Sequence, residues 1–271
     1  MKVDPAELGG GADEFVPKAK VVKVDTKAEL KAIEFSSKQV VIHTYTAGSV
    51  NTDLQTVLLS DSPDTVYAFD LTGSLMPQDF VDKCQAMLED ASVAKIGYDI
   101  KATFKAFLQL DVAITNVGHD VRMGAFLVNS LIREQSLTAL AQGIGYEGEE
   151  LDNLAPYDCL QRASEIASVM WELHAQQSEA MKQFPKMEDL AKDIEWPVME
   201  VLARMEVEGI GLDAPYLNDM SDRLADKISD VEQSIFGHAN KEFNVSSPAQ
   251  LSDVLFNDMK LPTQGLSLIH I

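Results

Sequence analysis

The sequence has few cysteines and no long apolar run, and each shortage excludes a class of protein. Only two of the 271 residues are cysteine, Cys84 and Cys159. They lie too far apart in the sequence to act as a chelating pair, so we expect a reducing cytoplasm rather than a disulfide framework. No run approaches the roughly 18 apolar residues of a membrane-spanning helix. The opening MKVDPAELGGGADEF also lacks the basic head and apolar core of a secretory signal. We therefore expect a cytoplasmic protein without a membrane partner.

Basic residues are also scarce. Lysine and arginine total 22 against 43 acidic residues, a formal net charge of −21. A chain this acidic repels phosphate backbones, and affinity for nucleic acid normally rests on lysine and arginine. Composition alone therefore argues against a nucleic-acid partner, unless a basic surface lies elsewhere in a larger protein. The apolar fraction of 46% excludes disorder as the main state and supports one large domain or two small ones.

Both ends of the chain have unusual compositions. Residues 1–24 include three consecutive glycines and flanking charges, which predict a flexible tail or a former linker. Residues 266–271 read LSLIHI, which resembles the translation of a transposon end used to prepare sequencing libraries. We expect this hexapeptide to be an adapter scar outside the fold, and the gene to be cut near Gly265; the alternative is an ordinary apolar strand end.

Strands and helices alternate in the first half of the chain. A buried strand rich in β-branched and aromatic residues is predicted at 39–46, further strands at 65–71 and 93–98, and one more strand or an extended edge at 112–117. Helices are predicted at 27–35, from Pro77, at 100–110 and after Asp120, whose carboxylate is placed to cap the first turn. The segment between 46 and 65 is predicted to be a polar loop. This alternation indicates an α/β fold with a mixed sheet flanked by helices.

The second half is predicted to be helical. Three helical patterns cover about 159–184, 188–208 and 214–237. The third has a continuous apolar stripe, and Gly209 is a plausible cap for the second. A last helix is predicted to begin with Ser247 as its cap and Pro248 in its first position, with Gln250 completing a capping box.

A family resemblance lies in this helical half. The segments IEWPVMEVLARMEVEGIGLD (194–213) and KEFNVSSPAQLSDVLFNDMKLP (241–262) resemble the start of the thumb in family A DNA polymerases of the bacterial DNA polymerase I type. Upstream, KIGYDIKATFKAFLQLDVAITNVGHDVRMGAFLVNS is similar to the middle of that family's 3′–5′ exonuclease domain, which has a ribonuclease H-like fold. The resemblance implies an exonuclease-like domain at 25–187 and a truncated thumb at 188–265.

The same resemblance indicates that the exonuclease carboxylates are lost. Proofreading nucleases use two divalent metals about 4 Å apart, held by carboxylate oxygens. The family's D-x-E motif lies on its first strand, where this chain has His43 and Tyr45. Its second aspartate corresponds to Thr103. Its Y-x-x-x-D motif corresponds to Arg162 and Ile166. We therefore predict no catalytic residue, no metal site and an inactive exonuclease.

One alternative stays open, an active 3′–5′ exonuclease with re-sited metal ligands. Its candidate ligands are Asp70, Asp99 and Asp120, with His43 as a fourth. Simpler roles exist for each of them. Asp70 ends a strand, where a carboxylate commonly forms a turn, and Asp99 and Asp120 precede helices that they can cap. His43 can be a hydrogen-bonded strand residue. The sequence also contains neither a phosphate-binding loop nor a dinucleotide fingerprint.

The resemblance implies a DNA-directed DNA polymerase of replication and repair as the parent protein. In that family, palm and fingers regions beyond the thumb carry out nucleotidyl transfer with Mg²⁺, so no cofactor is expected in this chain. DNA is the expected partner, mainly through those regions, and the chain is expected to be a monomer. Asn244, Ser246 and Ser247 match a thumb motif that touches the DNA backbone; their alternative role is a plain helix cap.

Overall fold

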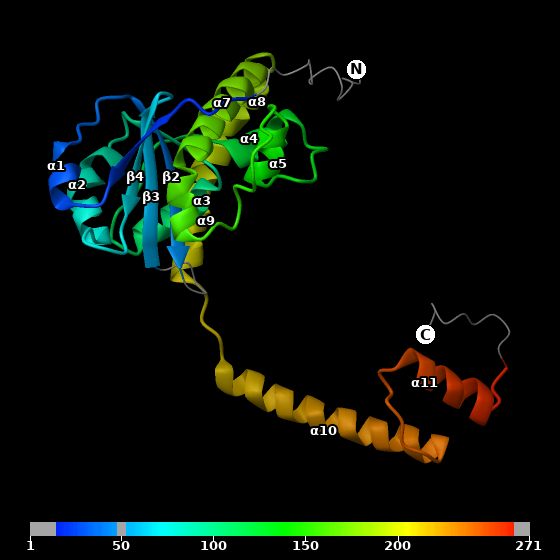
Figure 1. The fold of residues 1–271 in the computed structure, drawn as a ribbon. Coiled ribbons are helices and arrows are strands. Elements are labelled where there is room, and N and C mark those ends of the chain that lie inside the picture. Colours follow the sequence, from blue (N-terminus) through cyan, green and yellow to red (C-terminus); the bar gives the residue numbers. More distant parts are fainter. Residues whose placement is uncertain (1–14, 48–52, 263–271) are drawn as a thin grey trace. The chain divides into compact units, whose positions relative to one another are not determined.

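The chain forms two compact units, Met1–Gly209 and Ile210–Ile271. The structure is a computed structural model that describes residues 15–47 and 53–262 (Figure 1). The predicted adapter scar and residues 1–14 of the predicted tail lie outside the described residues. The division falls at Gly209 rather than between residues 187 and 188 as predicted. The physical reason is that Trp196 and Ala203, in the first predicted thumb helix, are buried in the core of the first unit.

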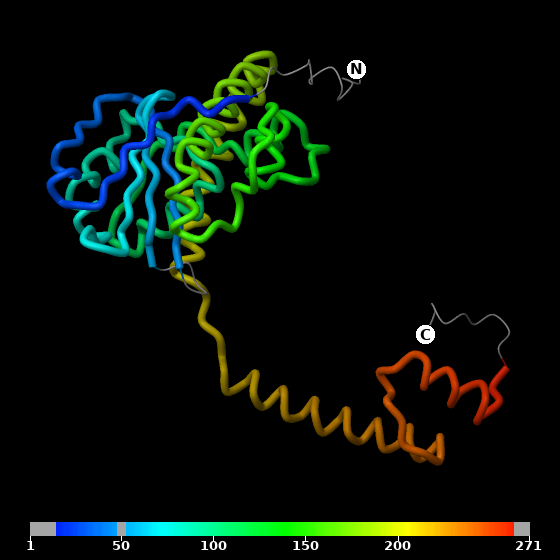
Figure 2. The backbone as a smooth tube through the Cα atoms, in the orientation of Figure 1, coloured from blue at the N-terminus to red at the C-terminus, as the bar shows by residue number. Residues whose placement is uncertain are grey.

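The first unit, whose backbone Figure 2 traces, is built on a six-stranded mixed sheet; the strand order is β1-β4-β3-β2-β5-β6. Strand β3 is antiparallel to both β2 and β4, whereas the β1–β4, β2–β5 and β5–β6 pairs are parallel. The strands are β1 Lys20–Val24, β2 Gln39–Ala47, β3 Asp53–Ser62, β4 Thr65–Asp70, β5 Ala94–Gly97 and β6 Val117–Asp120. This arrangement confirms the predicted α/β class with a mixed sheet.

Three predicted stretches of the sheet differ in the structure. Strand β1 lies within the predicted tail, because its valines pack into the core while β4 supplies its hydrogen-bonding partner. Strand β3 replaces most of the predicted polar loop, and its apolar run packs on both faces of the sheet. The strand predicted at 112–117 begins only at Val117. Val112 and Ile114 are buried against helices, so their apolar character reflects the core rather than strand pairing.

Helices cover both faces of the sheet. Alternate strand residues point to opposite faces, so Val41 and Leu58 belong to one core cluster while Ile42 and Leu59 belong to the other. Helices α2, α3 and α9 pack on the Ile42 face, and α5, α6 and α7 pack on the Val41 face. The helices of this unit are α1 Lys27–Ala32, α2 Pro77–Leu88, α3 Ile100–Leu108, α4 Val121–Val128, α5 Leu137–Gln142, α6 Pro156–Gln161, α7 Ala163–Lys182, α8 Pro185–Leu190 and α9 Trp196–Glu208.

The second unit is helical. It contains α10 Ala214–Ala239 and α11 Pro248–Ser252, the latter followed by a π-helical turn, Asp253–Asp258. The Ser247 hydroxyl accepts a hydrogen bond from the Gln250 backbone N–H, which confirms the predicted cap. The reciprocal half of the predicted capping box is not formed. The Gln250 side chain instead accepts a hydrogen bond from the Asn244 backbone N–H, at 2.9 Å.

No helix in the described part of the chain is both long enough and apolar enough to cross a membrane.

Candidate functional site

A hollow of about 480 Å³ opens where β2, the start of α3 and two loops meet. It contains both positions of the predicted first motif. Its walls combine aromatic rings with charges of both signs: His43, Thr44, Tyr45, Tyr98, Asp99, Arg122, Arg133, Glu134, Gln135, Ser136, Leu151, Asp152 and Asn153. A nuclease centre of the kind that the resemblance implies would therefore lie in this hollow.

His43 and Tyr45 face the hollow from one side of β2. Residues two apart on a strand share a face, and the two rings meet edge to face with their centroids 5.5 Å apart. The His43 Nδ1 atom is buried and has no hydrogen-bond partner among the described residues. Burial lowers the pKa of His43 to about 4, although the Asp152 carboxylate opposes the shift. His43 is thus neutral at neutral pH.

Tyr45 is also neutral, and its hydroxyl already has a hydrogen-bond partner. Its hydroxyl oxygen accepts a hydrogen bond from the Leu154 backbone N–H at 2.9 Å. Burial raises its pKa to about 12, because the phenolate would lose hydration. A neutral phenol is a poor ligand for Mg²⁺, which prefers carboxylate oxygens and water. The two side chains at the predicted positions of the D-x-E motif therefore supply no negative charge.

Thr103, the predicted remnant of the second carboxylate, lies on α3 and points toward β2. Its Oγ1 atom is 3.0 Å from the Oγ1 atom of Thr44, and the residue is almost fully buried. Thr44 alternates with His43 and Tyr45 along β2 and so faces the other side of the sheet. Asp99, just before α3, has a left-handed backbone with φ of 47°. Its carboxylate accepts a long hydrogen bond from Arg122, at 3.3 Å.

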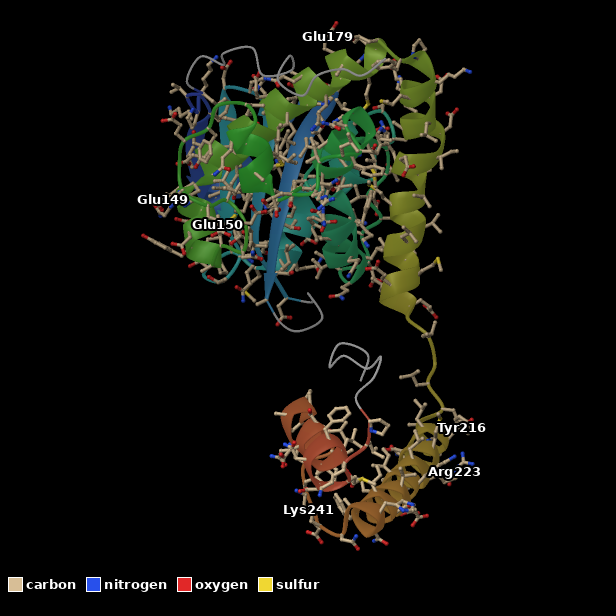
Figure 3. All side chains as sticks on the ribbon, turned by 90° about the vertical axis from the view of Figure 1, so that its right-hand side faces the viewer. Glu149, Glu150, Glu179, Tyr216, Arg223 and Lys241 are labelled. Carbon is tan, nitrogen blue, oxygen red and sulfur yellow. The ribbon has the colours of Figure 1, made fainter. Side chains whose placement is uncertain are left out.

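The third motif lies on α7. Ile166 is fully buried in the apolar cluster that also contacts Tyr45. Arg162, four residues earlier, forms an ion pair with Glu149, a residue labelled in Figure 3. An isoleucine side chain has no donor atom for a metal. Position 166 therefore contributes packing, and position 162 contributes a surface ion pair.

These residues do not fit the two-metal centre that the resemblance implies. The corresponding donors are a neutral imidazole, a phenol bonded to Leu154, and a hydroxyl paired with Thr44. Among the described residues, no group of three or more histidine, cysteine, aspartate or glutamate side chains is arranged to hold a metal ion. No catalytic step through such a metal can be derived for this chain.

Three of the four candidates for a re-sited metal centre, Asp70, Asp99 and Asp120, have other hydrogen-bond partners. Asp70 accepts hydrogen bonds from the backbone N–H and the hydroxyl of Thr72, as a turn former does. The Asp120 carboxylate accepts hydrogen bonds from the Ile100 N–H at 2.6 Å and the Met123 N–H at 2.8 Å. One carboxylate therefore caps the starts of both α3 and α4. Its role as a cap of α4 is confirmed. The bond to α3 could not be read from sequence spacing.

Sequence reasoning did not name Asp152. Its carboxylate accepts hydrogen bonds from the backbone N–H groups of Leu137 and Thr138 and from the Thr138 hydroxyl. These bonds attach one wall of the hollow to the start of α5. Tyr98, likewise unnamed, donates its hydroxyl proton to the Gln135 carbonyl at 3.0 Å. The sequence carries no local signal for either role, because the partners are 14, 15 and 37 residues away.

The three predicted thumb residues lie in the second unit, just before α11. Asn244 and Ser246 are exposed, and the Asn244 side chain accepts a hydrogen bond from the Ser246 backbone N–H at 3.0 Å. Ser247 caps α11, as its alternative role required. The structure brings the three residues together in one turn, and their contact with DNA stays a prediction.

Comparison with known proteins agrees with this geometry. A family model described as "DNA polymerase I, ribonuclease H-like domain" matches residues 77–154. DNA polymerase I of Pseudomonas aeruginosa is 28% identical over 194 residues, covering 65% of this chain and 21% of that protein. DNA polymerase I of Bacillus caldotenax is 27% identical over 187 residues, with the same coverages. The chain thus spans about a fifth of the length of these relatives.

A solved structure shows the same fold. The POL domain of Pol1 from M. smegmatis, in complex with DNA primer-template and dNTP, matches with a TM-score of 0.68 and 22% identity. The match covers 84% of this chain and 38% of that one. Sheet, flanking helices and family match together define a ribonuclease H-like domain of the 3′–5′ exonuclease type, followed by a helical segment. The comparisons support the resemblance that the motifs carry: this chain is similar to a fragment of a bacterial DNA polymerase I.

Proposed function

We propose that the first unit is an exonuclease-type domain without nuclease activity, which acts as a structural platform within a DNA polymerase I. The observation that carries the proposal is the chemistry of the hollow. The carboxylate positions of the three motifs hold His43, Tyr45, Thr103 and Ile166, and none of these side chains is anionic at neutral pH. Without carboxylates, two hard cations have no ligands. The fold persists because its core does not depend on them.

The wider assignment follows from the family. The parent protein would be a DNA-directed DNA polymerase of replication and repair, with DNA as its partner and Mg²⁺ as the cofactor of the whole enzyme. This chain would bind no metal, act in the cytoplasm as a monomer, and contribute no nucleotidyl transfer of its own. The DNA complex of the M. smegmatis relative supports DNA as the partner.

The loss of nuclease activity is tested directly with a 5′-labelled single strand. The purified chain should leave the strand at full length in Mg²⁺ or Mn²⁺. The fraction of shortened strand should equal that in a control without metal. The double variant His43→Asp, Tyr45→Glu should also be inactive, because the second and third motifs remain without carboxylates. Metal-dependent shortening that disappears in Asp99→Ala would contradict the proposal and establish re-sited ligands.

We also propose that the turn before α11 touches the DNA backbone. Its support is the pair of exposed polar side chains, Asn244 and Ser246, beside a helix start. The double variant Asn244→Ala, Ser246→Ala should weaken binding to a primer-template duplex about three- to tenfold at low salt, the typical cost of a lost polar contact. Fluorescence anisotropy measures the change, and Ser221→Ala on exposed α10 is the matched control. If the double variant and Ser221→Ala bind the duplex with equal affinity, the turn does not contact DNA and acts only as a helix cap.

A further inference from the structure

Helix α9 is attached to the first unit at two separate places. Its first residue, Trp196, is 5% exposed, and its indole lies 5.3 Å from the imidazole of His119 on β6, centroid to centroid. Near the other end, the Glu206 carboxylate forms ion pairs with Lys101 at 2.6 Å and Lys105 at 2.9 Å, both on α3. Ten residues of helix separate the two places, about 15 Å along its axis.

The helix also packs along α3, and three of its side chains, Trp196, Met199 and Ala203, lie in the core of the first unit. Between the two attachments, Met199 and Ala203 are its buried side chains, while its other large apolar residues are substantially exposed: Val198, Val201, Leu202, Met205 and Val207. Within the described residues, Glu206 is the one α9 side chain that forms an ion pair outside its own helix, since the Glu200–Arg204 pair is internal. The free energy of docking therefore depends heavily on the anchor and the ion pairs.

Both ends of α9 can bend. A π-helical turn, Ala191–Glu195, joins it to α8, and such turns interrupt the regular hydrogen-bond ladder of a helix. At the other end, Gly209 has φ of 71°, a conformation that glycine adopts without strain. The next residue, Ile210, is 89% exposed. These two places are the points about which α9 would rotate if it moved as a unit.

We propose that α9 is a strap that opens and closes on α3 as a unit, with the Lys101–Glu206–Lys105 cluster as its latch. The ion pairs are partly exposed, with side-chain exposures of 34%, 40% and 21% for Lys101, Glu206 and Lys105. Partly exposed ion pairs weaken as salt rises. Ionic strength therefore shifts the strap toward the open state, in which Trp196, Met199 and Ala203 leave the core while the strands β3 and β4 remain paired. This inference holds whether or not the first unit has nuclease activity.

Hydrogen exchange followed by mass spectrometry tests the strap on the whole chain. In the unmodified protein, backbone amides of residues 196–208 should exchange faster than those of β3 and β4, and faster still at high salt. Glu206→Gln keeps the size of the side chain but removes its charge, and should raise exchange in 196–208 about three- to tenfold with β3 and β4 unchanged. Glu208→Gln, on the same helix but outside the cluster, is the matched control and should change nothing.

Charge inversion makes the test specific to the latch. Glu206→Lys places three cations together and should open the strap further than Glu206→Gln. Adding Lys101→Glu and Lys105→Glu should restore slow exchange, which a role limited to helix propensity would not explain. If residues 196–208 exchange only together with β3 and β4, and neither salt nor Glu206→Gln changes their rate, α9 is part of one cooperative core and the proposal is wrong.

Discussion

Asp120→Ala should lower the free energy of unfolding of the first unit by on the order of 3 kcal/mol. Its carboxylate accepts from the backbone N–H groups of both Ile100 and Met123, at the starts of α3 and α4. The residue is 2% exposed, so water cannot easily replace the lost acceptor. Each orphaned buried donor costs about 1–3 kcal/mol. Denaturant unfolding followed by circular dichroism measures the loss.

Two comparisons make the Asp120 result interpretable. Asp120→Asn keeps one carbonyl oxygen and should lose about half as much, because one of the two helix starts remains capped. Asp70→Ala removes a carboxylate that also accepts two hydrogen bonds, but at an exposed turn, and should cost less than about 1 kcal/mol. Equal losses for Asp70→Ala and Asp120→Ala would show that the double capping of α3 and α4 contributes little.

Asp120 should also give the protein an unusual pH dependence. Burial raises its pKa from 3.8 to about 6, against the opposing hydrogen bonds from Ile100 and Met123. The folded state therefore binds a proton that the unfolded state has released between about pH 4 and 6. The part of Asp120's contribution that depends on its proton is present at low pH and is lost as pH rises through about 6, whereas the hydrogen bonds that its carboxylate accepts from Ile100 and Met123 remain. The difference between wild type and Asp120→Asn, measured from pH 4 to 7, isolates this group.

Ile166→Asp should destabilise the first unit by about 3–5 kcal/mol, the cost of an unpaired carboxylate in an apolar core. Ile166 is fully buried among apolar side chains of the α7 cluster. Either the carboxylate stays charged without a partner, or it takes up a proton and loses stability as pH rises. Ile166→Val is the matched control and should cost about 1 kcal/mol. A melting temperature of Ile166→Asp within about a degree of wild type would contradict the burial of this position.

Magnesium connects this substitution to the lost metal centre. A ligand that binds only the folded state raises its stability. Mg²⁺ should leave the melting temperature of Ile166→Asp unchanged, because a single carboxylate makes no site. In the variant that also carries His43→Asp, Tyr45→Glu and Thr103→Asp, Mg²⁺ should likewise leave the melting temperature unchanged, because Thr103 pairs with Thr44 on the other side of the sheet from His43 and Tyr45. A rise of several degrees in the quadruple variant would mean that the four positions converge on one site and that this placement is wrong.

Local patterns determined more of the helices than of the sheet. Pro77, Asp120 and Ser247 mark helix starts in the sequence and in the structure alike, because capping depends on residues three or four apart. Strand β1 was not predicted because its five residues form a strand only by pairing with β4. Each β1 residue pairs with the residue 45 positions later in the sequence. The run at Val112 showed the reverse error. Apolar character predicts burial, but a strand also needs a partner.

The sequence by itself carried the resemblance to DNA polymerase I and the identities of the residues at the motif positions. Those are statements about which residues follow one another, so the losses predicted at His43, Tyr45, Thr103 and Ile166 needed no coordinates. Only the tertiary structure decided what these side chains do instead: Tyr45 bonds to Leu154, and Thr103 pairs with Thr44. It also decided that α9 belongs to the first unit. The physical reason is that each of these outcomes is a contact between distant parts of the chain, formed only when the whole core packs.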